Sequence, residues 1–337
     1  MRDFVSRSRK RILIKDRVGV YHVISRTACQ AFLLGPKEKE QFCNLLFKQA
    51  HFAGIEVLSY CIMSNHVHLL LRVPPLNSMH DSELLRRYTN YYGEEKIPKS
   101  TYSVQELKEI LLTGGNAATQ ARIRIFARMG NLPSFMRELK QRFSIWYNHK
   151  QKNQGTIWSA RYKSLIVEDE PESLTRVAAY IDLNPVRAEI VTDPKDYRWC
   201  SYAASLAGQM LARKATIQLF HGMRDYANSI TSYRMILFGK GYTSKRATGK
   251  DRGILSADQL EAVIQQNGKV PLHELLRVRV RYFSDGLALG SPGFIQSLFE
   301  ENRGHFGASR KRGGTALPSM SWGTLHVMRD LRRRTYG

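Results

Sequence analysis

Residues 58–72, LSYCIMSNHVHLLLR, carry two histidines in a short apolar stretch from which the fold can be inferred. Apolar residues lie on both sides of a polar corner made by Ser64 and Asn65, and the part after it is rich in Val and Leu. This length and composition favour a buried strand over a helix. Because alternate side chains of a strand share a face, His66 and His68 are expected to point the same way.

Two histidines placed in this way have two interpretations. The imidazoles can hold a single metal ion between them, since histidine is the commonest metal ligand in proteins. The alternative is a half-buried pair that hydrogen-bonds to the backbone or to a neighbouring carboxylate. A motif this short also occurs by chance, so the rest of the chain has to decide between them.

The composition indicates a globular protein with a polyanionic partner. In 337 residues there are 52 Lys and Arg against 29 Asp and Glu, a net charge of +23, and 43% of the residues are hydrophobic. Nucleic acid phosphates favour such an excess of cations through counterion release. A membrane surface is the competing polyanion, but no apolar run reaches the length of a membrane span. We therefore expect a nucleic acid partner and no membrane.

The N-terminal residues and the cysteines indicate a cytoplasmic, nucleoid-associated protein. Residues 1–17 are expected to form a basic arm, and they lack the apolar core of a secretory signal. The four cysteines form no Cys-x-x-Cys pair and no zinc-ligand spacing. They are expected to be reduced thiols.

The pattern over residues 18–75 predicts an α+β arrangement. Strands are expected over 18–26 and 55–63, with a helix over 37–52 between them that Gly54 ends. The histidine strand follows. The order strand, helix, strand, strand suits a sandwich with helices on one face of the sheet.

An insertion with its own small helices is expected over residues 76–133, with helical patterns over 82–92 and 104–112. A longer helix is predicted over 134–150, apolar on one face and basic on the other. The cations of its polar face either contact DNA or are simply solvated. They include Arg137, Lys140 and Arg142.

Aromatic and basic residues alternate ahead of a short apolar strand over 164–167. Trp158, Arg161 and Lys163 can stack on bases and pair with phosphates. The alternative is that Trp158 and Tyr162 belong to the core at the entry of the strand.

Two polar side chains mark the end of a helix predicted over 172–183. Tyr180 and Asn184 are four positions apart and so share a helix face. Asn184 precedes Pro185 and also fits the N-cap of a following helix. Without further context, Tyr180 is better explained as one of sixteen tyrosines on a half-buried helix face.

Several separated blocks resemble the single-tyrosine HUH transposases, and in particular the REP-associated tyrosine transposases. In chain order they are YHVISR, SNHVHLLLRV, MRELKQRFSIWYN, IWSARYKS, YIDLNPVRAEIV and DYRWCSY. They define a domain over residues 18–205 that the insertion at 76–133 interrupts. Blocks in a fixed order are far more specific than a His-x-His tripeptide.

The resemblance implies a ferredoxin-like or RRM-like antiparallel sheet, with His66 and His68 on a central strand and Tyr180 on a helix that faces it. It implies that the histidines hold Mg²⁺ or Mn²⁺, and no small-molecule cofactor is expected. Tyr180 would attack a DNA phosphate and leave a 5′-phosphotyrosine link and a free 3′-OH. Related transposases usually carry Gln four residues after the tyrosine. Asn184 stands there in this chain, and its role as a third metal ligand stays open.

The implied substrate is single-stranded DNA near hairpin-forming palindromic repeats, cut and rejoined by a monomer or a homodimer. The RRM-like sheet and the basic aromatic segments suit splayed bases, and Arg187 joins the expected DNA contacts. The alternative function is a non-catalytic, hairpin-specific DNA-binding regulator that keeps the fold. Intact His66, His68 and Tyr180 favour the enzyme.

Beyond residue 205 the resemblance ends. We expect a connecting segment and linker over 206–253 and a basic, all-helical C-terminal domain over 254–337. A grip on duplex DNA and a scaffold role are both open for this domain. A chain that ends near Gly239 is expected to fold and cleave. The helices of the domain are predicted over 256–266, 271–283 and 292–301.

Overall fold

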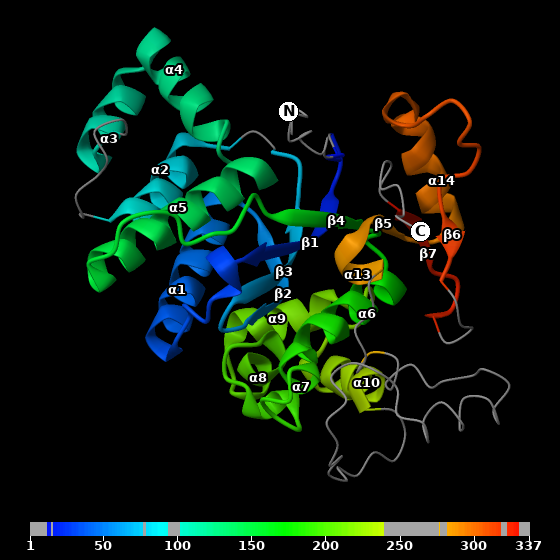
Figure 1. Cartoon of the computed structure of the whole chain (residues 1–337). Coiled ribbons are helices and arrows are strands. Elements are labelled where there is room, and N and C mark those ends of the chain that lie inside the picture. The colour runs from blue at the N-terminus through cyan, green and yellow to red at the C-terminus, as the bar shows by residue number, and fades with distance from the viewer. Residues whose placement is uncertain are drawn as a thin grey trace, which may run out of the picture.

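The computed structural model describes residues 12–14, 16–76, 79–93, 102–238, 276, 282–317 and 322–329. Their strands form one seven-stranded sheet in the order β2-β3-β1-β4-β5-β7-β6 (Figure 1). The strands are β1 (Gly19–Arg26), β2 (Glu56–Ile62), β3 (His66–Val73), β4 (Lys163–Val167), β5 (Gly286–Gly290), β6 (Thr315–Ala316) and β7 (His326–Arg329).

Helices of very different length surround the sheet. The helices of the first half of the chain are α1 (Pro36–Ala53), α2 (Asp81–Tyr92), α3 (Val104–Thr113), α4 (Gly115–Phe126) and α5 (Leu132–Gln151). Those that follow are α6 (Pro171–Asp182), α7 (Asn184–Arg187), α8 (Ser201–Leu206), α9 (Met210–Gln218), α10 (Tyr226–Phe238), α13 (Tyr282–Asp285) and α14 (Pro292–Glu301).

The first four strands form the ferredoxin-like core that the sequence predicts. Along the chain, β1, α1, β2, β3, α5 and β4 alternate as in that fold, and the strands lie in the order β2-β3-β1-β4 with every neighbouring pair antiparallel. Gly54 ends α1 in the left-handed conformation at φ 66°, where a residue without Cβ is least strained. The α+β prediction is confirmed, and His66 and His68 lie on β3, between β1 and β2.

Helices cover both faces of this sheet, not one. On β3, Val67, Leu69 and Leu71 pack into a core shared with α1 and α5, whereas Leu70 packs on the opposite face with α6 and α8. The expectation of helices on one face is therefore wrong. Nearly every residue of β1 and β3 is buried, the polar ones included, so both faces of these strands are covered. Their faces are not open for base stacking, as an RRM-like surface would be.

The described C-terminal residues add strands to the sheet, so the expectation of an all-helical domain is wrong for them. β5 runs parallel to β4, which makes the sheet mixed, and β7 pairs with both β5 and β6. The helix predicted over 292–301 is confirmed as α14. The helix predicted over 256–266 lies outside the described residues, as does most of the one predicted over 271–283.

The sequence disguises β5 because glycines bound its five residues, GLALG, and suggest loops. Both glycines are needed for close packing. A Cβ on Gly290 would lie 2.7 Å from the Cβ of Glu168 and 2.6 Å from the ring of Phe294. A Cβ on Gly286 would lie 2.9 Å from the carbonyl oxygen of Tyr282. Here glycine permits close approach of a strand to its neighbours, and does not mark a turn.

The predicted insertion forms a satellite of the main fold, made of α2, α3 and α4. Its apolar side chains pack on Phe52 at the end of α1, with the rings of Phe52 and Tyr91 stacked 4.5 Å apart. Arg128 closes this cluster: its guanidinium lies 4.8 Å from the centre of the Phe52 ring and pairs with Glu138 of α5. The two predicted helices are confirmed, and α4 was not predicted.

The block DYRWCSY protects the free edge of β2. The Ile62 N–H donates to the carbonyl oxygen of Trp199 at 3.0 Å, and the Tyr197 hydroxyl donates to the carbonyl oxygen of Ile62 at 2.8 Å. The backbones of Cys61 and Cys200 pair as an isolated antiparallel β-bridge. All four cysteines are free thiols. This segment satisfies polar groups that an exposed edge strand would offer to other chains.

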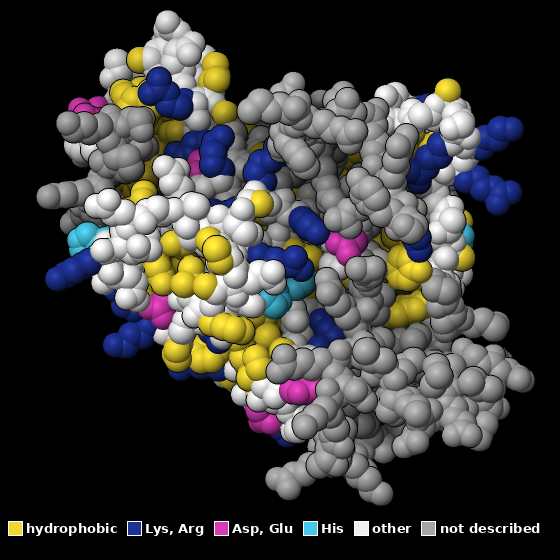
Figure 2. Space-filling view, in the orientation of Figure 1, with side chains coloured by type: hydrophobic (Ala, Val, Ile, Leu, Met, Phe, Trp, Pro, Cys, Tyr) yellow, Lys and Arg dark blue, Asp and Glu magenta, His cyan; other side chains and the backbone are white. Residues whose placement is uncertain are grey.

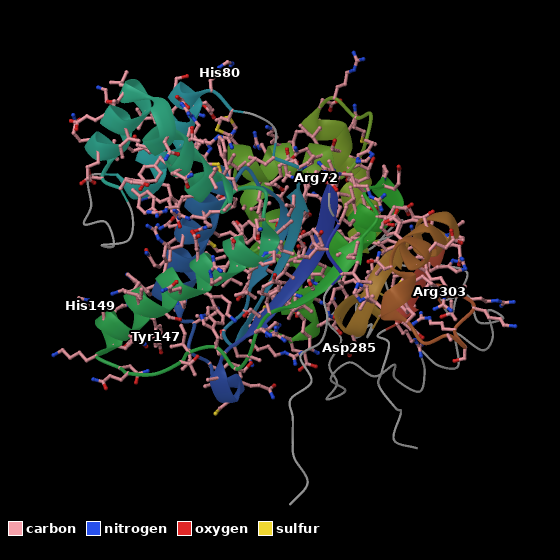
Figure 3. All side chains as sticks on the ribbon, turned by 90° about the horizontal axis from the view of Figure 1, so that it is seen from above. Arg72, His80, Tyr147, His149, Asp285 and Arg303 are labelled. Carbon is pink, nitrogen blue, oxygen red and sulfur yellow. The ribbon has the colours of Figure 1, made fainter. Side chains whose placement is uncertain are left out.

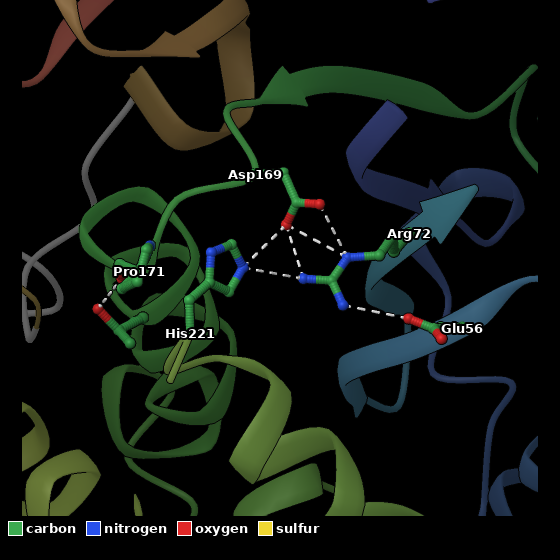
Figure 4. A network of polar contacts seen from close by, with 6 residues as sticks. Glu56, Arg72, Asp169, Pro171 and His221 are labelled. Atoms are coloured by element: carbon green, nitrogen blue, oxygen red, sulfur yellow. Dashed lines mark hydrogen bonds and ion pairs between the residues drawn. The ribbon is translucent and has the colours of Figure 1, made fainter. Parts of the chain in front are cut away.

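An ionic network lies at the other end of β2 and β3, away from the DYRWCSY block (Figure 4). Arg72, at the end of β3, lies between Glu56 of β2 and Asp169, with N···O distances of 3.1 Å and 2.6 Å. His221 approaches the same Asp169 oxygen at 3.5 Å. The network joins β2, β3 and the connection between β4 and α6, which is the connection that carries the chain onto the second sheet face.

Basic side chains are distributed over much of the face seen in Figure 2, where Asp and Glu form only small patches. In the view from above, His80 of the insertion and Arg303 near α14 lie on opposite sides of the sheet (Figure 3). Within the described part of the chain, no helix is both long and apolar enough to cross a membrane.

Candidate active site

His66 and His68 lie on one face of β3, as the strand periodicity predicts. Their ring centres are 5.0 Å apart, and His68 is buried whereas His66 is half-buried. The corner before β3 orients His66, because its Nδ1 lies 2.7 Å from Oδ1 of the preceding Asn65. Since an amide oxygen only accepts, Nδ1 is the protonated nitrogen and Nε2 of His66 is the one with a lone pair.

Tyr180 lies beside these histidines, in the last turn of α6. Its side chain is buried, and its ring centre is 6.2 Å from that of His68. Phe283, from the C-terminal region, packs on the same ring with centres 5.0 Å apart. The structure thus brings together the tyrosine and the histidine pair, which are more than a hundred residues apart in sequence.

Asn184 completes the group that the sequence singles out. Its Nδ2 lies 3.4 Å from Nε2 of His66, and only 9% of the residue is exposed. The N-cap of α7 is Leu183, and Asn184 is the first residue of that helix, so the prediction of an N-cap at Asn184 is wrong. Leu183 is both the C-cap of α6 and the N-cap of α7, so Asn184 follows Tyr180 by four residues, and its amide faces His66 of β3.

Arg187 lies against Tyr180 and not on an open surface. Its guanidinium carbon is 3.9 Å from the centre of the Tyr180 ring. It donates hydrogen bonds to the carbonyl oxygens of Tyr180 and Leu276, at 2.5 Å and 2.9 Å. Burial lowers the pKa of Arg187, yet a guanidinium keeps its charge far above neutral pH. A fixed positive charge therefore lies next to the aromatic ring of Tyr180.

His22 is a member of the site that sequence reasoning missed. It lies on β1, is fully buried, and its Nε2 is 2.8 Å from Nδ1 of His68. Burial lowers the pKa of His22 to about 4, and burial together with His66 lowers the pKa of His68 well below its ordinary value. The signal was present in YHVISR: a histidine that alternation places on the same face of the strand as the apolar Val20 and Ile24.

The side chains around His66 and His68 are compatible with the divalent metal that the resemblance implies. Among the residues that the structure describes, no group of three or more His, Cys, Asp and Glu side chains could hold a metal ion. The available donors are Nε2 of His66, a ring nitrogen of His68 and the side-chain amide of Asn184, whose oxygen would be the ligand atom. Neutral imidazoles with an amide oxygen fit an open Mn²⁺ or Mg²⁺ site that water and phosphate complete.

The basic residues of α5 expected to bind DNA differ in their surroundings. Arg137 is exposed, whereas the Arg142 guanidinium lies 4.0 Å from the centre of the Tyr91 ring, at the border with the insertion. Lys140 donates to the carbonyl oxygen of Ala160 at 2.7 Å, and so ties α5 to the segment before β4.

The aromatic and basic segment before β4 is divided between core and surface. Trp158 and Tyr162 are buried, and the Trp158 indole donates to the carbonyl oxygen of Lys140 at 3.2 Å, which favours the core interpretation for both rings. Arg161 is exposed. Lys163 pairs with Asp285 of α13 at 3.1 Å, which places it at the junction with the C-terminal strands.

Comparison with known proteins bears on residues 18–103, the part that contains β1, α1 and the histidine strand. Those residues match the family described as transposase IS200 like. This match bears out the resemblance to IS200-like transposases for the residues that carry YHVISR and SNHVHLLLRV, and it supports a DNA transposase or nuclease role. No curated protein matches the chain. Among solved structures, one described as the structure of the REP associates tyrosine transposase bound to a REP hairpin matches at 14% identity and a TM-score of 0.37, over 60% of this chain and 86% of that one.

Proposed function

We propose that this IS200-like protein is a metal-dependent, single-strand DNA endonuclease and strand transferase with Tyr180 as its nucleophile. The observation that supports the proposal best is the convergence on Tyr180. His68 of β3, Arg187 of α7 and Phe283 of the C-terminal region all pack against its ring. A tyrosine of the core alone would not require a buried guanidinium and a histidine pair around it.

The proposed reaction exchanges one phosphodiester for another. The Tyr180 oxygen attacks the scissile phosphorus, the bond from phosphorus to the 3′ oxygen breaks, and the DNA 5′ end remains linked to the phenol oxygen. The phenol loses its proton, and the departing 3′ oxygen gains one. Arg187 holds the ring and places positive charge close to the site at which negative charge develops. The linkage is itself a phosphodiester, so a second 3′-OH can reverse the step without ATP.

A divalent ion held by His66, His68 and Asn184 would polarise a phosphate oxygen and so stabilise the transition state. The chain's own contribution is to keep these donors in place: Asn65 orients His66, and burial keeps His68 neutral. His68 therefore presents a lone pair at neutral pH.

The proposed substrate is single-stranded DNA at a palindromic repeat that folds into a hairpin. With a net charge of +23, the chain has cations to bind phosphates along both the hairpin stem and the flanking strand. The exposed Arg137 and Arg161 are proposed contacts of this kind. Bases would have to bind outside the covered faces of β1 and β3.

The test is a cleavage assay with hairpin oligonucleotides and Mn²⁺, in which a covalent protein–DNA adduct is separated on a denaturing gel. We expect the adduct with the unaltered chain, its loss on chelation of the metal, and its loss in His66→Ala and His68→Ala. Hairpin affinity should be nearly unchanged in these variants, because phosphate contacts supply most of it. The exposed His149 provides the matched control, since His149→Ala should cleave normally.

Two results would count against the proposal. Normal cleavage by both histidine variants would remove the metal site from the mechanism. Tight hairpin binding without an adduct in any divalent metal would indicate the non-catalytic regulator instead.

A further inference from the structure

Two successive hydrogen bonds connect the C-terminal region to His68. The carbonyl oxygen of Phe283 lies 2.8 Å from Nδ1 of His22, and Nε2 of His22 lies 2.8 Å from Nδ1 of His68. The two imidazoles are stacked, with centres 5.1 Å apart and ring planes 23° from parallel. His22 is completely buried and His68 is 5% exposed, so water does not compete for these bonds.

The direction of both hydrogen bonds follows from the carbonyl oxygen of Phe283. A carbonyl oxygen can only accept, so Nδ1 of His22 carries the proton. His22 is completely enclosed in the core, where a second proton would bury a charge without a counterion, so its ring carries one proton. Nε2 of His22 is then an acceptor, and Nδ1 of His68 donates to it. A neutral imidazole has one N–H, so the lone pair of His68 is on Nε2.

We propose that His22 is a positioning residue, which fixes His68 in the tautomer and ring orientation that present Nε2 to a divalent metal. The use of that nitrogen for metal binding rests on the proposed function. The tautomer itself rests only on the geometry of the three residues. Partners of this kind orient metal ligands in many proteins, and their loss typically weakens metal affinity by about 10-fold to 100-fold.

The C-terminal region is part of the active site, because the carbonyl oxygen that accepts the hydrogen bond from His22 belongs to Phe283. Phe283 is fully buried, and its ring packs on Tyr180 and on Trp322, with centres 5.0 Å and 5.3 Å apart. It belongs to α13, which leads directly into β5, the strand paired with β4. A shift of β5 would therefore move the Phe283 carbonyl and release His22.

The direct test is the ¹⁵N NMR spectrum of the histidine side chains in the metal-free chain. For both His22 and His68 we expect a protonated Nδ1 and an unprotonated Nε2. Observation of the Nε2–H tautomer at His68 would overturn the proposal, and this measurement needs no variant that might fail to fold.

A pair of variants tests the effect on the metal. His22→Gln places an amide oxygen near the position of Nε2 and keeps an acceptor for His68, whereas His22→Leu fills the space without one. Free Mn²⁺ measured by electron paramagnetic resonance should show affinity within a few-fold of the unaltered chain for Gln, and a loss of roughly 10-fold to 100-fold for Leu. His68 should also lose its single tautomer in the Leu variant.

Equal Mn²⁺ affinity in the two variants would contradict the positioning role, because a residue that only fills space would be replaced equally well by either. The outcome is separable from that of the proposed function. If His68 shows the expected tautomer and Mn²⁺ binds, but no covalent adduct forms, the positioning role of His22 stands and the strand-transfer reaction is rejected.

Discussion

Replacement of Phe283 by alanine tests whether the C-terminal strands belong to the same core as the transposase-like domain. Phe283 is fully buried between Tyr180 of α6 and Trp322 of the C-terminal region, so the shorter side chain leaves a cavity that neither neighbour can readily fill. Truncation of a buried phenylalanine costs about 3–5 kcal/mol. Because a single domain typically has only about 5–15 kcal/mol of stability, this loss is large.

The assay is urea unfolding followed by tryptophan fluorescence and by far-ultraviolet circular dichroism. We expect one cooperative transition with coincident curves, shifted to lower urea in Phe283→Ala by a free energy within that range. Phe32→Ala is the matched control: Phe32 is 80% exposed, and its loss should change stability by less than about 0.5 kcal/mol.

Two transitions, of which Phe283→Ala shifts only one, would show that the C-terminal region unfolds by itself and would refute the single-core interpretation. A change no larger than that of Phe32→Ala would refute the packing argument.

Three further predictions follow from the site and its surroundings. A chain that ends at Phe238 loses β5 and the Phe283 acceptor, and should be poorly soluble and give no adduct, in contrast to the expectation from sequence alone; normal cleavage would contradict the structure. Asn184→Ala should raise the Mn²⁺ concentration needed for half-maximal cleavage. Because Asn184 is not a helix cap, the unfolding free energy of the variant should change by less than about 1 kcal/mol. A loss of stability without a change in metal dependence would show that Asn184 is structural and not a metal ligand. Burial raises the pKa of Asp182 to about 7 from an ordinary 3.8. The protonated carboxyl group therefore contributes fully to the stability of the fold below pH 3.8, and this contribution is lost as the pH rises to about 7. Urea unfolding of Asp182→Asn from about pH 4 to about pH 8 should lack this loss of roughly 4 kcal/mol, and an unchanged pH dependence would show that Asp182 is ionised in the folded chain.

The comparison of Asp182→Asn with the unaltered chain isolates one titration among several. His22 has its pKa lowered to about 4 by burial, so its contribution has the opposite sign: stability is lost as the pH falls toward that value. That contribution is common to both chains and cancels in the difference. Asp182 matters structurally because it accepts hydrogen bonds from the Tyr233 hydroxyl and the Tyr202 N–H, which fix α10 and α8 against α6.

Much of the ferredoxin-like core could be predicted from the sequence, because local patterns specify it. The apolar run around His66 and His68 gave the central strand, helical spacing gave α1 and α5, and Gly54 marked the end of α1. The proximity of Tyr180 to the histidines came from the resemblance. No periodicity connects residues so distant in the chain.

What the sequence did not predict depends on long-range packing. The strand β5 was not predicted, because Gly290 is required by its contacts with Glu168 and Phe294, which cannot be recognised from the local sequence. His22 was overlooked because a single histidine in a strand has no special spacing, and only the register of β1 against β3 brings it to His68. The pattern at Asn184 fits an N-cap, but Leu183 caps α7, and the Asn184 side chain contacts His66 instead.

Identification of the residue that carries DNA in a trapped adduct tests the central claim most directly. The unaltered chain is incubated with a hairpin oligonucleotide and Mn²⁺, the adduct is digested, and the modified peptide is sequenced by mass spectrometry. The account predicts a nucleotide on Tyr180, and no adduct in Tyr180→Phe, which removes one oxygen and keeps the ring between Arg187 and Phe283. A nucleotide on Tyr162, Tyr197 or Tyr202, or an adduct that persists in Tyr180→Phe, would contradict it.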